Sequence, residues 1–484
     1  MCANVLAQQG MSNSQVQSFG SAQGSGQMLG QAQDDIFNQA EAKKDLKLKA
    51  KTIGLRTVLS MGLNKNVDQK VRNYLNEKIE LDWDDSFESF WFPDVNLTLN
   101  SGTQLVETLR RSSSVDTTSG KVPTGSLSLD LGNYTVFNWG RDYLEYVNSK
   151  STYQRNKQKL NEQRRQLRFN LISQYFNLVK TKNIQRWRRE QLRHTSFIHR
   201  LARQKLALKK ITSQEYYQTR AEYLRAQTLF QESQASSIEE DESLAQLIGD
   251  NLETTYKPRE DLKFIVINTS REESLRMALR QSPDYRDAKV DIENSNRSFQ
   301  KSIKDNMPLP KFNLNLGAYK TSFSKSGRHT EYEGSNGGRD VEVVASINLT
   351  WNIVGNGGLF NSRDRKRAYL NKRMAEEKFF NTKRAINVTI RTIYRRMRFL
   401  ERKSEVSDVQ LKNAQSAFDY TLDNYISGKT NFANLKIALE RTIEAYINYE
   451  TAKYDHLVLK LELANLMGLE DFPGSNFENL AQRT

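Results

Sequence analysis

The side chains that most often catalyse reactions or hold metal ions are sparse in this sequence and form no recognisable set. The chain has 4 histidines and a single cysteine. His194 and His199 are five residues apart, so they would not share one face of a helix, and no cysteine cluster accompanies them. Metal sites and activated nucleophiles need such groupings. The sequence therefore predicts no catalytic residue, no metal ion, no cofactor and no enzymatic activity.

One glycine-rich segment deserves comparison with a nucleotide-binding loop. Gly355-Asn356-Gly357-Gly358 follows a predicted strand and precedes a predicted helix. The spacing of its third glycine does not fit a dinucleotide loop, and no βαβ unit surrounds it. We interpret this segment as a turn from strand to helix.

Basic side chains are the most abundant source of chemistry in the chain. Lys and Arg number 72 against 57 for Asp and Glu, which gives a formal net charge of +15. The densest clusters lie in Arg155–Arg193 and Arg363–Arg373. They could form a solvated helix face, line a lumen that favours anions, or bind nucleic acid. Because no nucleic-acid-binding module is visible, we predict no nucleic-acid partner.

The elements that would position these side chains occur twice. Three pairs of similar segments follow one another in the same order at offsets of 216 to 219 residues: Leu59–Leu63 with Leu275–Leu279, Pro93–Leu99 with Pro310–Leu316, and Leu244–Gly249 with Leu463–Gly468. Such self-similarity indicates a tandem duplication. We predict one structural repeat over residues 36–250, a second over 251–470, and a C-terminal tail over 471–484.

The N-terminal 35 residues differ in composition from the rest. They are rich in Gln, Ser and Gly and lack hydrophobic periodicity, which predicts disorder. Val5-Leu6-Ala7 before Gln8 has the small-residue pattern of a signal-peptide remnant, although an arbitrary N-terminus is the alternative. Cys2, as the single cysteine, allows no intrachain disulfide; a lipid on Cys2 is conceivable, but no lipobox precedes it.

Each repeat contains two predicted strands in which apolar and polar residues alternate. They span about 94–103 and 124–134 in the first repeat, and 310–320 and 340–352 in the second. Nine to eleven residues is the length of a tilted strand that crosses a membrane. Four strands cannot close a barrel, so oligomerisation would have to supply the others. A soluble two-sheet core is the alternative.

Aromatic residues flank these strands where they meet the helices. Such side chains are typical of the membrane interface, and the candidates are Trp83, Trp91, Phe92, Phe137, Trp139 and Trp351. No stretch approaches 18 consecutive apolar residues, so no transmembrane helix is predicted.

A long helical hairpin follows the strands in each repeat. The first spans 138–249 with a turn near 209–213, and the second spans 357–468 with a turn near 427–431. Leu435, Leu439, Thr442, Tyr446 and Tyr449 follow the heptad spacing of a coiled coil. Only 7 prolines and a hydrophobic content of 37% favour elongated helices with narrow apolar seams.

Taken together, these segments resemble the TolC family of outer-membrane efflux and secretion channels. The matching features are Ala278-Leu279 with Ser282-Pro283, Pro310 before an alternating strand, Trp351 before glycines, Tyr425–Gly428 before the returning helix, and the closing Leu463–Gly468. The resemblance implies a mainly helical homotrimer in the bacterial outer membrane. Three chains with four strands each would form a 12-stranded transmembrane β-barrel, and their helices would form an α-helical barrel through the periplasm.

The resemblance also implies partners and a mechanism. The channel would be the exit duct of a tripartite efflux pump or a type I secretion system, and it would conduct substrates passively. Its hairpin turns would form the periplasmic tip, where they would meet a periplasmic adaptor protein and an inner-membrane ABC or proton-driven exporter. The alternative is a soluble, elongated coiled-coil scaffold whose basic faces bind anionic polymers.

The implied tip residues can be named. Adaptor contacts would come from the turns, at Lys209, Lys210, Thr212, Ser213, Ser427, Gly428, Lys429 and Thr430. Some family members narrow the tip with aspartates just after the turn. Aligned on Gly428 those positions are Asn434 and Ile437, and aligned on Lys210 the position in the first repeat is Tyr216. We therefore expect a neutral or basic tip.

Overall fold

The computed structural model describes residues 50–111, 115–130, 134–321, 342–351, 362–471 and 481–483. The chain divides into two units, Met1–Lys51 and Thr52–Thr484, and the second contains the helices and the sheet discussed below. The expected signal remnant, Cys2 and the turn at Gly355–Gly358 lie outside the described residues.

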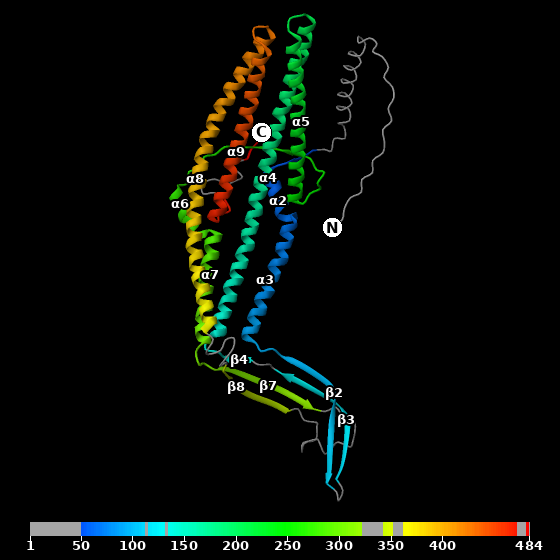
Figure 1. Ribbon diagram of the computed structural model, residues 1–484, viewed down its shortest axis with the longest axis vertical. Helices are drawn as coiled ribbons and strands as arrows, with labels where there is room; N and C mark the ends of the chain where they lie inside the picture. The colour runs from blue at the N-terminus through cyan, green and yellow to red at the C-terminus, as the bar shows by residue number, and fades with distance from the viewer. Residues whose placement is uncertain are drawn as a thin grey trace, which may run out of the picture. The chain divides into compact units, whose positions relative to one another are not determined.

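The described elements form two series in the same order, namely two helices, then strands, then two long helices, and the first series has the additional short strand β4 (Figure 1). The first series consists of α2 (Leu55–Lys65), α3 (Val67–Trp91), β2 (Asn96–Arg111), β3 (Val115–Asp130), β4 (Tyr134–Phe137), α4 (Arg141–Ala207) and α5 (Ser213–Ile248). The second consists of α6 (Arg271–Gln281), α7 (Pro283–Asp305), β7 (Lys311–Thr321), β8 (Glu342–Thr350), α8 (Ser362–Ile426) and α9 (Phe432–Met467). Short strands β1 (Lys51–Ile53), β5 (Tyr256–Pro258), β6 (Glu260–Leu262) and β9 (Ala481–Arg483) accompany them.

Some boundaries differ from those predicted from the sequence. β2 and β3 are 16 residues long each, so they extend into the segment that the alternation pattern treated as a loop between 103 and 124. That segment is rich in Thr and Ser, and Thr and Val favour extended backbone. The predicted C-terminal tail contains β9, which pairs antiparallel with β6.

Each repeat contains one very long helix after its strands, α4 in the first repeat and α8 in the second. They contain 67 and 65 residues, which at about 1.5 Å per residue corresponds to roughly 100 Å each. No proline interrupts either helix. α5 packs antiparallel on α4, and α9 on α8, which gives two helical hairpins.

The returning helices end in the same way. α5 stops at Gly249 (φ 69°) and α9 at Gly468 (φ 71°). Asp250 N donates to Ala245 O at 2.9 Å, and Leu469 N donates to Ala464 O at 3.0 Å. These bonds satisfy carbonyl groups that a helix end would otherwise leave unpaired, and the left-handed conformation that they require is accessible to glycine.

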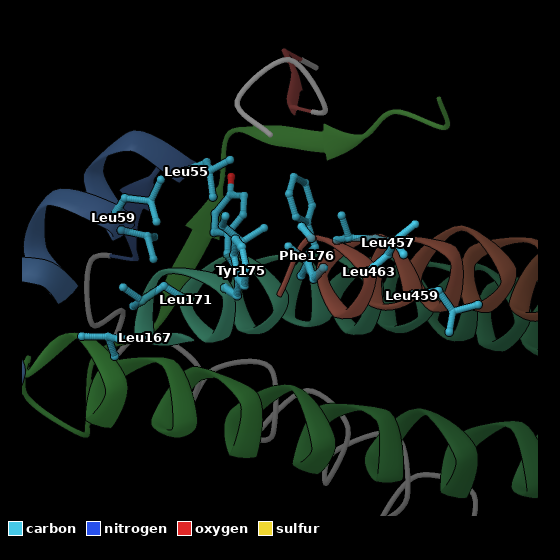
Figure 2. Close-up of a cluster of buried hydrophobic side chains, with 14 of the residues drawn as sticks. Leu55, Leu59, Leu167, Leu171, Tyr175, Phe176, Leu457, Leu459 and Leu463 are labelled. Atoms are coloured by element: carbon cyan, nitrogen blue, oxygen red, sulfur yellow. The ribbon is translucent and has the colours of Figure 1, made fainter. Parts of the chain in front are cut away.

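The main core joins the two repeats around α4. Leu55 and Leu59 from α2 lie beside Leu171 and Tyr175 of α4, and Leu457 and Leu463 from α9 lie beside Phe176 (Figure 2). Tyr175 is fully buried, and its hydroxyl donates to Glu260 Oε2 at 3.4 Å. Each fully buried side chain of this size contributes about 1.5–3 kcal/mol to folding.

A second, smaller core lies between the hairpins near their turns. It contains Ile198, Phe418, Tyr425, Phe432, Leu435, Leu439 and Ile443. Leu435 and Leu439 belong to the predicted heptad seam, and this cluster joins them to α8 of the same hairpin and to Ile198 of α4. None of the helices within the described residues has a segment both long and apolar enough to cross a membrane.

Candidate functional surfaces: the sheet and the hairpin turns

The long strands form one antiparallel sheet to which both repeats contribute. β7 is its centre: β3 and β4 pair with successive segments of one edge of β7, and β8 pairs with the other. β2 pairs with β3 from Asn96 opposite Asp130 to Arg111 opposite Val115. Counting β3 and β4 as one interrupted strand, the described residues form four adjacent strand positions in the order β2, β3 with β4, β7 and β8.

The register segregates apolar and polar side chains. Along β7 and β8 the apolar cross-strand pairs are Phe312 with Leu349, Leu314 with Ile347, and Leu316 with Ala345; the polar pairs between them are Asn313 with Asn348 and Asn315 with Ser346. Successive residues of a strand point to opposite faces. One face of this sheet is therefore apolar, and the other is polar.

The apolar face is not covered by any other part of the described chain. Leu97, Leu99 and Ile347 are 68%, 71% and 68% exposed. Leu97 lies opposite Leu129, which is also exposed. A contiguous exposed patch of this kind marks a surface that binds a membrane or another protein.

The aromatic residues at the ends of the strands have two different environments. Trp83 is half-buried, with its ring stacked on Tyr153 of α4 at 5.3 Å between centroids. The other five are exposed: Trp91, Phe92, Phe137, Trp139 and Trp351. Trp139 is fixed by a hydrogen bond of 3.0 Å from its Nε1 to Pro310 O. Exposed aromatics next to the uncovered apolar face fit an interfacial position, whereas Trp83 packs within the helices.

The two hairpin turns share one hydrogen-bond pattern. In the first, Lys209 N donates to Leu206 O and Lys210 N to Lys205 O; in the second, Gly428 N donates to Tyr425 O and Lys429 N to Asn424 O. The residue in the left-handed conformation is Lys209 (φ 54°) in one turn and Gly428 (φ 79°) in the other. The turns therefore correspond at an offset of 219 residues, with Lys209 in the place of Gly428.

This correspondence moves the sequence alignment of the turns by one residue. Thr212 Oγ1 accepts from Glu215 N at 3.2 Å, as Asn431 Oδ1 accepts from Asn434 N at 3.1 Å. The counterpart of Asn434 is therefore Glu215, and that of Tyr216 is Leu435. Tyr216 is half-buried, with its ring 5.4 Å from that of His199. The sequence alignment placed Lys210 opposite Gly428, whereas the residue with the left-handed conformation in the first turn is Lys209. No glycine in that turn marks the position.

The other residues expected at the turns are mostly open to solvent. Lys209, Lys210, Ser213, Gly428 and Lys429 are exposed. Thr212 is also exposed and caps α5. Ser427 is exposed, and its hydroxyl donates back to Asp423 O at 2.9 Å. Thr430 accepts a hydrogen bond from the side chain of Asn434 at 3.2 Å. Asn434 and Ile437 are exposed on the first turns of α9. The exposed side chains of these turns include the three lysines.

Ion pairs connect the hairpins close to their turns, and they could not be predicted from the sequence. Glu222 of α5 is buried, with its Oε2 3.1 Å from Lys436 Nζ of α9. Arg225 Nη1 lies 2.7 Å from Glu440 Oε1. Glu215 Oε1 accepts from Phe432 N at 3.3 Å. Only the tertiary arrangement reveals these partners, which come from segments more than 200 residues apart.

Many residues of the first basic cluster are bound to acidic residues on neighbouring helices. Arg155 Nη1 lies 2.6 Å from Asp291 Oδ1, and Lys159 Nζ lies 3.3 Å from Asp287 Oδ2. Arg168 Nη2 lies 3.0 Å from Asp471 Oδ1. This part of the cluster thus connects α4 to α7 and to the end of α9, which reduces the charge that it offers to a polyanion.

The described residues contain no group of three or more His, Cys, Asp or Glu side chains placed to hold a metal ion. His456 of α9 is buried, and its Nε2 lies 3.5 Å from Glu401 Oε1 without a hydrogen bond. Burial lowers the pKa of His456 to about 3, and the nearby Lys460 adds to the effect. His456 is therefore a neutral core residue at physiological pH.

No protein-family model matches the chain, and no curated protein matches it in sequence. Solved structures do match. The outer membrane protein VceC of Vibrio cholerae is 14% identical, covering 86% of this chain and 96% of its own, with a TM-score of 0.69. The CmeC outer membrane channel of Campylobacter jejuni is 16% identical, covering 88% of both chains, with a TM-score of 0.71.

The open state of the MtrE outer membrane channel of Neisseria gonorrhoeae is 14% identical, with a TM-score of 0.62 over 86% of this chain and 89% of its own. The agreement extends over 88% to 96% of the length of each of these structures and over 86% to 88% of this chain. This chain has the TolC-like fold of outer-membrane channels.

Proposed function

We propose that this protein is the outer-membrane channel of a tripartite efflux pump or a type I secretion system. It would conduct substrates passively from an inner-membrane ABC or proton-driven exporter to the outside of a bacterial cell. The observation that carries the proposal is the sheet, whose apolar face is uncovered while its reverse is polar. A wall between lipid and a water-filled pore needs this distribution.

Closure of the pore requires further copies of the chain. Among the described strands, β2 and β8 pair on one side only. An unpaired strand edge in lipid would leave backbone groups unsatisfied, at a cost of several kcal/mol for each group. Pairing of β8 in one copy with β2 in the next removes both edges. Three copies with four strand positions each would give the 12-stranded barrel of a homotrimer.

The helices offer matching surfaces for the same assembly. Each helix has exposed apolar residues separated by seven or fourteen positions. They are Tyr217, Leu224 and Ile238 in α5, and Phe399, Val406 and Tyr420 in α8. Seven-residue spacing is the pattern by which long helices pack on one another. We propose that α8 of one copy packs on α5 of the next to form the helical barrel in the periplasm.

The hairpin turns are the proposed periplasmic tip and adaptor-binding surface. Lys209, Lys210 and Lys429 are exposed there, so the tip would be basic at its outermost residues. An adaptor that binds this surface would therefore present acidic or neutral groups. A carboxylate is nonetheless close by, because Glu215, and not Tyr216, is the counterpart of Asn434 in the second turn.

Fractionation tests the proposal against a soluble scaffold that binds anionic polymers. The channel should sediment with outer membranes, resist a wash in 1 M salt and need detergent for release. At this salt concentration, surface charges are screened beyond about 3 Å. Purified protein should then form conducting trimers in planar bilayers. Release by salt alone, as expected for electrostatic binding to a polyanion, would contradict the proposal.

A further inference from the structure

The ends of α3 and α8 next to the sheet carry opposite charges. α3 leads into β2, and α8 begins after β8. In the second half of α3 the charged residues are Glu77, Glu80, Asp82, Asp84, Asp85 and Glu88, against Lys78. At the start of α8 they are Arg363, Arg365, Lys366, Arg367, Lys372 and Arg373, against Asp364. The function proposed above makes no use of this difference in sign.

The side of α3 that faces away from α4 is an acidic stripe. Trp83 stacks on Tyr153 and Phe90 on Tyr146, so these rings mark the face of α3 that packs on α4. The opposite face repeats at alternating spacings of three and four residues and consists of Tyr74, Glu77, Leu81, Asp84 and Glu88. All of these residues are exposed, Leu81 to 59%. Within the described residues, none of the carboxylates of this stripe has an ion-pair partner.

The side of α8 that faces away from α7 is a basic stripe. Ala375 is buried, and the ring of Phe379 lies 5.2 Å from that of Tyr285 on α7. The opposite face has the same alternating spacing and consists of Arg363, Lys366, Leu370, Arg373, Glu377 and Phe380, all exposed. Among its cations, only Arg373 has an ion-pair partner within the described residues, Glu376 of its own helix at 3.0 Å. An exposed pair of this kind is weak.

Both stripes contain charges that their own helix disfavours. Glu88 lies in the last turn of α3, where the helix dipole is negative, and Arg363 lies in the first turn of α8, where it is positive. Each charge therefore destabilises the helix end on which it lies. Each would be favourable beside the end of the other helix, which has the opposite sign of dipole.

α3 and α8 are the two ends of a row of helices, since α3 packs on α4, α4 on α7 and α7 on α8. Pairing of β8 in one copy with β2 in the next, as proposed above, would bring the start of α8 beside the end of the next α3, with the helices antiparallel. A register with Leu81 opposite Leu370 also brings Glu88 opposite Arg363, because both leucines lie seven residues from these charges. The remaining carboxylates, Glu77 and Asp84, would then lie next to Arg373 and Lys366.

We propose that the acidic stripe of α3 binds the basic stripe of α8 from a second copy of this chain. Leu81 and Leu370 would exclude water from the middle of the contact, and the flanking charges would select the partner helix and its direction. The proposal rests on the proposed function, to which it adds a partner surface for α3. The packing of α8 on α5 proposed above leaves α3 without one.

Charge reversal tests the proposal on the full chain. One variant carries Glu77→Lys, Asp84→Lys and Glu88→Lys, and the other carries Arg363→Glu, Lys366→Glu and Arg373→Glu. Because Glu88→Lys and Arg363→Glu suit the dipoles of their own helices, both variants should fold, as checked by circular dichroism. Each should lower the fraction of trimer in detergent extracts about tenfold at low salt, because like charges then face each other. Mass photometry measures this fraction, and part of the loss should be recovered in about 1 M salt, where charges are screened beyond about 3 Å.

A combined variant with both reversals in one chain distinguishes pairing from net charge. Every contact in its ring again joins opposite charges, and its net charge equals that of the native chain, so the fraction of trimer should return to about the native level. A mixture of the two singly reversed proteins should not recover. In a ring of three, at least one contact would then join two stripes of like charge.

The matched controls are Asp82→Lys and Arg365→Glu, which reverse exposed charges outside the stripes and should assemble like the native protein. Trimer loss that the combined variant does not restore would overturn the proposal, as would an equal loss in the controls. Native-like assembly of both reversed variants would also overturn it, while conduction by those trimers would leave the channel proposal intact. A native protein that forms no trimers would refute both.

Discussion

Gly468 lies so close to the main chain of Gln281 that a Cβ atom at this glycine would be 2.4 Å from the carbonyl oxygen. Gly249 has the same relationship to Lys65, with a distance of 2.9 Å. In each repeat, the end of the returning helix thus abuts the break between two helices, α2 and α3 or α6 and α7. The glycine that ends each copy of the repeated motif is required by both its backbone conformation and this contact.

Replacement of Gly468 by alanine should destabilise the protein more than the same change at Gly428. Both glycines have positive φ, but nothing lies within 4 Å of a Cβ atom at Gly428. Gly428→Ala should therefore cost only the left-handed strain, about 1–2 kcal/mol, whereas Gly468→Ala adds a clash with backbone and should cost about 3 kcal/mol or more. Urea unfolding of the detergent-solubilised variants measures both. Equal losses would show that the contact with Gln281 is unimportant.

Lys209 provides a prediction of opposite sign. Because it adopts φ 54° without being glycine, Lys209→Gly should relieve about 1–2 kcal/mol of strain and lose part of this gain, about 0.4–1 kcal/mol, to the entropy of the unfolded chain. A net stabilisation of about 0.5–1 kcal/mol is expected in thermal unfolding. Lys210→Gly removes the same charge one residue later, where φ is not positive, and should be neutral or destabilising. Stabilisation by both variants would point to charge repulsion instead.

The contrast between these two turns shows where sequence reasoning succeeds and where it stops. Gly428 could be recognised as a helix end because glycine favours the left-handed conformation. Lys209 could not, because lysine gives no local signal for it, and the alignment of the first turn slipped by one residue. Likewise, alternation identified the two faces of the sheet, but the continuation of β2 to Arg111 depends on pairing with β3.

The basic cluster on α4 shows the same limit at the level of tertiary contacts. Its charges could be counted from the sequence, but Asp287 and Asp291 of α7 were not recognisable as partners. They lie more than 120 residues away in the chain. For the same reason the sequence did not reveal the buried Glu222, since its partner Lys436 belongs to the other repeat.

A charged residue on the apolar face of the sheet should prevent membrane assembly, whereas one on the polar face should be tolerated. Ile347→Arg and Asn348→Arg place the same side chain on opposite faces of β8. In lipid, the first should cost about 2–4 kcal/mol if the site is near the membrane centre. The measurement is the fraction of protein recovered as detergent-soluble oligomer from the membrane pellet. A similar yield for both variants would mean that this face does not contact lipid.

Buried His456 should make the protein less stable in mild acid. Burial lowers its pKa to about 3, compared with about 6.5 for an unfolded chain. The unfolded state therefore binds a proton first as the pH falls, and the folded state loses stability from about pH 6.5 down to about pH 3. Between pH 6.5 and 5 this amounts to about 2 kcal/mol, measured as a change in the free energy of urea unfolding.

Two charged neighbours determine how that experiment is controlled. Lys460, whose pKa burial lowers to about 8, is protonated throughout the range in both states and adds no slope. Burial raises the pKa of Glu401, so its protonation favours the folded state as the pH falls and opposes the histidine. His456→Gln should therefore reduce the acid-induced loss, and Glu401→Gln should steepen it. Part of the loss should remain in His456→Gln, because burial also lowers the pKa values of His194 and His199. An unchanged pH dependence in His456→Gln would locate the acid sensitivity elsewhere in the chain.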